Sequence, residues 1–131
     1  MARVNITSGE KGVEGSTAGW SIKAYSKSLT LESSGEKSDW NASEIEGLYS
    51  SARGDGGPGF GLHAALGDEQ NVDLGRIGDE RNALDLLESL AANLEVRFDE
   101  HTGRSVEADE HGMNVIEQIQ TFPDRWPIIT N

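Results

Sequence analysis

Cysteine is absent from the 131-residue sequence, and the aromatic residues make up only 6% of it. Without thiols the chain has no disulfide, no thiolate nucleophile and no cysteine-ligated zinc site. No apolar run approaches the roughly 18 residues that a membrane-spanning helix requires, so we expect no membrane association. The first residues carry no apolar segment of the kind found in secretory signals, which predicts a cytoplasmic location.

Basic residues are scarce as well. The chain holds 11 Lys and Arg against 23 Asp and Glu, which gives a net charge of −12. Binding to a phosphate backbone needs clustered bases, so we expect no direct contact with nucleic acid. Residues 1–67 hold eight acids and six bases, whereas residues 68–131 hold fifteen acids and five bases. This asymmetry predicts an acidic surface in the second half of the chain.

Glycine is abundant and divides the chain into segments. Residues 1–19 contain four glycines and few apolar side chains, which predicts a flexible N-terminal segment with one short strand at residues 3–7. From Trp20 onward, apolar residues alternate with polar ones, as in half-buried strands. The pattern predicts five strands, at Trp20–Tyr25, Ser28–Ser33, Glu44–Tyr49, Phe60–Leu66 and Asn71–Ile77. Residues 33–37 are expected to form a polar turn.

The apolar spacing becomes helical after Ile77. Six apolar residues recur on one stripe, which predicts an amphipathic helix over residues 79–93 with Asp79 suited to its N-terminus. A second run of this kind predicts a short helix at about residues 114–121, which Pro123 ends. The apolar tail beyond it, residues 126–129, is expected to serve as a strap, an edge strand or a docking peptide.

Together these elements predict one α+β domain over residues 1–131. We expect an antiparallel β roll or partly open barrel closed by the helix at residues 79–93. The core is expected in residues 20–94, and residues 95–131 form an acidic C-terminal extension.

The order of strands and helix in residues 20–94 resembles the pleckstrin-homology-like (PH-like) superfold. The resemblance implies a scaffold for protein docking. Well-characterised members bind phosphoinositides through bases in the first hairpin loop, but here the matching turn, Ser26-Lys27, is too short. Lipid binding is therefore not expected.

The acidic second half predicts a non-enzymatic protein–protein interaction module that needs no cofactor. Its partner would be a protein with a basic surface, bound through carboxylates, through the apolar tail, or through both. The candidate partner-binding residues are Glu80, Asp85, Glu88, Asp99, Glu100, Glu107, Asp109, Glu110, Trp126 and Ile128. In an alternative, these carboxylates imitate phosphates. The protein would then be a viral or mobile-element inhibitor of a nucleic-acid-binding protein in the host cytoplasm.

The triplet Asp-Glu-His occurs twice, starting at Asp99 and at Asp109. Carboxylates and imidazoles are ligands for zinc, manganese and iron. Adjacent strand residues point to opposite faces, so each triplet offers at most two ligands, Asp99 with His101 and Asp109 with His111. A second alternative is thus a metal-dependent enzyme built on residues 99–111. A solvated acidic loop is the competing interpretation.

Other catalytic patterns are missing. No serine lies in a Gly-x-Ser-x-Gly motif, which places an exposed nucleophile on a sharp turn. His63 lies opposite the apolar side of its strand, which predicts a surface histidine without a catalytic partner. We therefore expect no catalytic residues.

Overall fold

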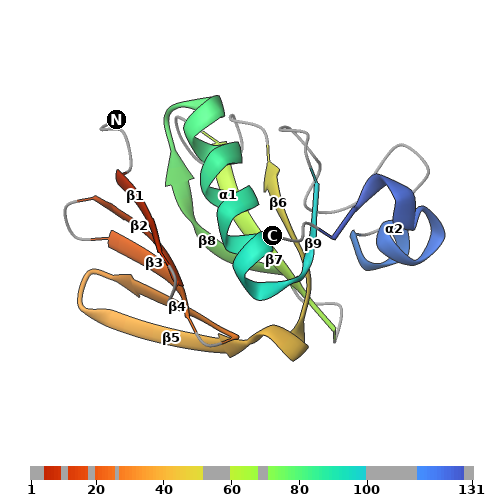
Figure 1. Cartoon of the computed structure of the whole chain (residues 1–131), viewed down its shortest axis with the longest axis horizontal. Coiled ribbons are helices and arrows are strands. Elements are labelled where there is room, and N and C mark those ends of the chain that lie inside the picture. Colours follow the sequence, from red (N-terminus) through yellow and green to blue (C-terminus); the bar gives the residue numbers. More distant parts are fainter. Residues whose placement is uncertain are drawn as a thin grey trace.

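The computed structural model describes residues 5–9, 12–17, 20–25, 27–51, 60–67, 71–99 and 115–128. These residues form two β-sheets and two α-helices (Figure 1). The longer helix lies between the sheets, and the shorter one lies beyond the second sheet. The α+β class predicted from the sequence is confirmed.

The first sheet is an antiparallel meander in which each strand pairs with the next one in the chain. Its strands are β1 (Asn5–Gly9), β2 (Gly12–Thr17), β3 (Trp20–Tyr25), β4 (Ser28–Ser33) and β5 (Glu36–Asn41). Ser34 and Gly35 join β4 to β5, and both adopt positive φ, as a two-residue type I′ hairpin requires. This tight turn fixes the register of β4 against β5.

The second sheet has the strand order β8-β7-β6-β9. The 3₁₀ helix η1 (Ala42–Glu44) leads into β6 (Ile45–Ser51), which is followed by β7 (Phe60–Leu66), β8 (Asn71–Ile77) and, after the long helix, β9 (Arg97–Phe98). The pairs β6–β7 and β7–β8 are antiparallel, and β9 pairs with β6 in parallel. No described strand pairs across the two sheets, so they do not close into a barrel.

Helix α1 (Glu80–Leu94) builds the core between the sheets. The Asp79 carboxylate accepts a hydrogen bond from the backbone N–H of Asn82 at 2.8 Å, and so satisfies one of the free N–H groups of the first turn. The buried stripe consists of Ala83, Leu86, Leu87, Leu90, Ala91 and Leu94. It packs against Ile22 and Leu29 of the first sheet and Leu48 of the second. Each buried leucine stabilises the fold by about 1.5–3 kcal/mol.

A second, smaller core lies on the other side of the second sheet. It consists of Tyr49, Ala65, Ile119 and Trp126. Helix α2 (Val115–Thr121) and the 3₁₀ helix η2 (Pro123–Arg125) bring Ile119 and Trp126 to this face. The chain then returns to β9, where the N–H of Phe98 donates to the carbonyl of Pro127 at 3.0 Å. The apolar tail thus packs back as a strap against β9.

The two helices and the five expected strands lie within a residue or two of their predicted bounds. The sequence prediction was wrong in two segments. Residues 12–17, expected within a flexible segment, form β2, and Val13 is part of the core. Residues 36–41, partly expected as a turn, form β5.

Both errors have a physical cause. At Gly12, strand β2 lies so close to β3 that a Cβ would collide with the carbonyl oxygen of Ala24. Small residues therefore stand where a strand usually has large apolar ones. Strand β5 is the edge of its sheet, and only Trp40 on it is partly buried, so no alternation marks it.

Candidate functional site

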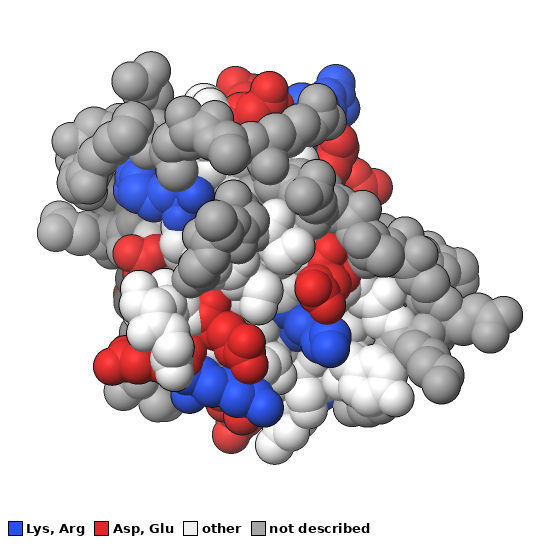
Figure 2. All heavy atoms as spheres, turned by 90° about the vertical axis from the view of Figure 1, so that its left-hand side faces the viewer, with Lys and Arg blue, Asp and Glu red and all other residues white. Residues whose placement is uncertain are grey.

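The outer face of the first sheet, which points away from α1, is polar, and no described element packs on it (Figure 1). On this side of the molecule the described basic and acidic residues are interspersed (Figure 2). Strand register arranges the polar side chains in rows that run across the strands. The first row is Glu14, Lys23, Thr30 and Asp39, and the second row is Ser16, Ser21, Glu32 and Lys37.

The two rows differ in how their side chains are used. In the first row Lys23 Nζ lies 3.8 Å from Glu14 Oε2, and Thr30 Oγ1 donates to Asp39 Oδ1 at 2.6 Å. In the second row, no hydrogen bond or ion pair links a side chain to another described residue. Among the described residues, none therefore competes with a ligand for the side-chain hydrogen bonds of the second row.

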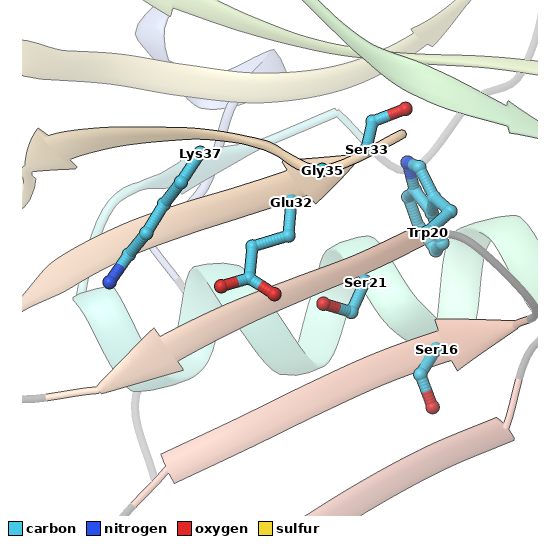
Figure 3. Close-up of a pocket in the computed structure, with 7 residues that line it drawn as sticks. All are labelled: Ser16, Trp20, Ser21, Glu32, Ser33, Gly35 and Lys37. Carbon is cyan, nitrogen blue, oxygen red and sulfur yellow. The ribbon is translucent and has the colours of Figure 1, made fainter.

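A groove follows the second row (Figure 3). One hollow of about 400 Å³ extends from this row to Trp20, Ser33 and Gly35. A hollow of about 230 Å³ lies between the two rows and shares Ser21, Glu32 and Lys37 with the first hollow. We call the two together the polar groove.

The polar groove offers hydroxyls, two carboxylates and two ammonium groups. The charges of Glu14 and Glu32 balance those of Lys23 and Lys37. Such a surface suits a polar ligand with both donors and acceptors, such as an extended peptide, more than it suits an ion of one sign.

A separate hollow of about 310 Å³ lies where β5 passes through η1 into β6. It is lined by Trp40, Glu44, Leu66 and Gly67, and we call it the seam pocket. The N–H of Gly67 donates to the carbonyl of Glu44 at 3.0 Å, and the N–H of Asn41 donates to Glu44 Oε2 at 3.1 Å. The first bond holds the backbone of Glu44, and the second holds its carboxylate.

Three of the predicted partner-binding carboxylates lie on α1. Glu80 and Glu88 are exposed, and Asp85 is half-buried. Glu100, Glu107, Asp109 and Glu110 lie outside the described residues.

The prediction was wrong for Asp99, which is fully buried. Its N–H donates to the carbonyl of Leu48 at 3.1 Å, which continues the pairing of β9 with β6 by one residue. Asp99 therefore cannot be part of an exposed acidic docking surface.

Trp126 is also buried, at 1% exposure, so the expected docking role of the apolar tail is wrong at this residue. Its indole meets the ring of Tyr49 edge to face, with the centroids 5.9 Å apart. Ile128 remains 48% exposed and forms an isolated bridge with Arg97. The tail mainly covers the second sheet.

Of the proposed metal ligands, His101, Asp109 and His111 lie outside the described residues. Within the described ranges, no group of three or more His, Asp or Glu side chains could hold a metal ion. The fourth candidate, Asp99, is fully buried, and its backbone N–H is bonded to Leu48 of the second sheet.

His63 is buried at 7% exposure, contrary to the prediction of a surface histidine. Its ring stacks on Tyr49 with the centroids 5.1 Å apart. Burial lowers the pKa of His63 below 6.5; Arg76 lowers it further, and Asp73 opposes the shift. The strand alternation did not predict this burial, because the far face of the sheet is covered too.

Sequence reasoning missed both the polar groove and the seam pocket. The hairpin turn at Ser34-Gly35 was a usable signal, because a two-residue turn pairs Glu32 with Lys37 across the strands. No sequence signal places Trp40 near Leu66, since this contact depends on how the two sheets meet.

The chain was compared with protein families, with curated proteins and with solved structures. No family model matches the chain, and no curated protein or solved structure is significantly similar to it. The described helices include none that is long and apolar enough to cross a membrane.

Proposed function

We propose that the chain is a non-enzymatic interaction module that binds an extended segment of a protein partner in the polar groove. The observation that carries the proposal is the second row of the first sheet. Ser16, Ser21, Glu32 and Lys37 project from a face of the sheet on which no described element packs. Their side chains make no hydrogen bond or ion pair with other described residues. A polar row of this kind can hold a peptide through many weak contacts.

The charges of the groove favour one orientation of the bound segment. Glu32 attracts a basic side chain and Lys37 an acidic one, and the two occupy paired positions on neighbouring strands. Opposite charges so placed fix the register of a partner more than they raise its affinity. The groove would therefore select a segment with alternating charge.

The acidic excess of the chain acts at longer range. Glu80 and Glu88 are exposed on α1, outside the groove. Carboxylates on the surface raise the rate at which a positively charged partner arrives, and salt weakens this attraction. A basic partner that presents one mixed-charge segment fits both features.

A PH-like architecture is part of this proposal. It is supported by the order of the elements: the meander β2–β5, then the meander β6–β8, then α1 between the two sheets. Under this proposal the two sheets would be halves of a partly open roll closed by α1. Such a scaffold is compatible with docking but does not specify it.

The test compares capture of partners by the wild-type chain and by Lys37→Glu. Tagged protein is incubated with native lysate at low salt, and retained proteins are eluted in a salt step and identified. We expect Lys37→Glu to retain the main partner at least about tenfold less, since it reverses one charge of the row. Arg81→Glu, which makes the same change on exposed α1, is the matched control and should retain it fully.

Equal capture by Lys37→Glu and wild type would contradict the proposal that the polar groove binds the partner. If the partner is instead a nucleic-acid-binding protein released early in the salt step, and is lost with Glu80→Gln and Glu88→Gln, the protein acts as a phosphate mimic.

A further inference from the structure

We infer that the seam pocket binds the guanidinium group of an arginine side chain from another chain. This inference concerns a second site and does not depend on the polar groove. Trp40 pairs in register with Leu29, a core residue, and so lies on the inner side of the first sheet, whereas the groove follows the outer side.

The lining of the pocket matches the chemistry of a guanidinium. Trp40 supplies an indole and Leu66 an apolar wall, while Glu44 supplies a carboxylate. The face of an indole attracts a cation, and a carboxylate accepts two parallel N–H bonds from arginine. Arginine uses both contacts at once, because its planar head can stack on a ring while its edge donates hydrogen bonds.

A second carboxylate lies at the border of the pocket. Glu46 Oε1 would be 3.3 Å from a Cβ placed on Gly67, which itself lines the pocket. None of the described residues that line the pocket is a base that would offset these two charges. The nearby strand turn carries Lys27, but its ammonium lies 2.8 Å from Glu95. The described residues in and beside the pocket therefore carry a net negative charge, from Glu44 and Glu46, which favours a cationic ligand.

The pocket is also held in shape before binding. One oxygen of Glu44 already accepts from the N–H of Asn41, and the Glu44 carbonyl accepts from Gly67. The N–H of Ala42 donates to the carbonyl of Lys27 at 2.8 Å, which ties the η1 helix to the turn that precedes β4. A fixed carboxylate loses little conformational entropy when an arginine binds.

The three tryptophans allow a direct test by NMR. The indole N–H signals of ¹⁵N-labelled protein are assigned with Trp40→Phe, and the protein is titrated with N-acetyl-arginine amide. We expect a saturable shift of the Trp40 signal alone. The Trp20 indole N–H is bonded to the carbonyl of Leu74 at 2.9 Å, and Trp126 is buried, so their signals should stay in place.

Two comparisons identify the cause of the shift. N-acetyl-citrulline amide has the same shape without the charge, and we expect it to bind at least about tenfold more weakly. Glu44→Gln should weaken arginine binding by about tenfold, because the amide can keep the bond from Asn41 but loses the charge. Glu88→Gln, an exposed acid on α1, should leave binding unchanged.

The inference is wrong if the Trp40 signal does not move, if citrulline moves it equally, or if Glu88→Gln weakens binding as much as Glu44→Gln. Equal binding of N-acetyl-lysine amide would overturn the preference for arginine. Should Glu44→Gln fail to fold, Glu46→Gln provides the same test without a capping role. The probes are small molecules, so the result is independent of any partner captured by the groove.

Discussion

The two sheets of this protein differ in how many of their faces are covered. The first sheet packs on α1 with one face and leaves the other without a described covering element. The second sheet packs on α1 with one face and on α2 and Trp126 with the other. The burial patterns reflect this: β3 alternates between buried and exposed residues near its end, whereas six consecutive residues of β7 are buried.

This difference shows when strand alternation predicts exposure. A polar or small residue faces water only if its side of the sheet is uncovered. Lys23 in β3 is exposed as its pattern predicts, but His63 in β7 is buried with a similar pattern. The outer face of the first sheet therefore has no described element packed on it, whereas the far face of the second sheet is buried under α2 and Trp126.

The largest effect should follow from uncovering the second sheet. Trp126→Ala removes the largest side chain of the smaller core, and we expect a loss of about 3–5 kcal/mol in the free energy of unfolding. Tyr25→Ala removes an aromatic ring that is 46% exposed on the first sheet, and should change stability by only about 0.5 kcal/mol. Urea unfolding of both variants measures the difference. Similar losses would mean that the two outer faces are not covered differently.

A smaller effect is expected at the contact between the sheets. Gly75 in β8 has φ of +131°, and a Cβ there would lie 2.6 Å from Trp20 Nε1 in β3. Gly75→Ala should therefore cost about 2–3 kcal/mol, through backbone strain and displacement of the indole from Leu74.

The matched control for this variant is Gly35→Ala. Gly35 also has positive φ, at +84°, but nothing lies within 4 Å of its Cβ position. Gly35→Ala should lower the free energy of unfolding only by the cost of placing alanine at a positive φ, about 1 kcal/mol. Thermal unfolding of the two variants separates strain from collision. If both lose the same stability, Trp20 does not link the sheets.

The fold was largely predictable where the pattern was strong. The stripe of α1 and its cap at Asp79 follow from residues close in sequence. The edge strand β5 could not be found in this way, because an exposed edge needs no apolar side chains. Residues far apart in sequence form the smaller core, so the burial of Trp126 could not be deduced from its own segment.

The candidate sites were harder to predict than the fold. Net charge pointed to carboxylates in the second half, yet the described residues that line the polar groove and the seam pocket lie within positions 14–67. Charge counts locate an excess along the chain but do not show which side chains share a surface. That depends on register, which aligns Glu32 with Lys37, and on the meeting of the sheets, which brings Trp40 to Leu66.

The smallest effect should appear in the pH dependence of stability. Burial holds the pKa of His63 below its ordinary 6.5, so on acidification the unfolded chain takes up a proton before the folded chain does. Its contribution to stability is therefore complete above about pH 6.5 and is lost as the pH falls toward the lower folded value. Urea unfolding at roughly pH 7.5 and pH 5.5 should show a loss in wild type that His63→Gln reduces.

This pH dependence also tests the comparison of the two sheets. His63 stacks on Tyr49, which in turn contacts Trp126, so the covering of the far face is what desolvates the imidazole. In Trp126→Ala the pKa of His63 should move back toward 6.5, and the His63-dependent loss of stability should shrink. NMR titration of the His63 ring protons measures that pKa directly. An unchanged pKa in Trp126→Ala would show that the inner core, and not the strap, buries the imidazole.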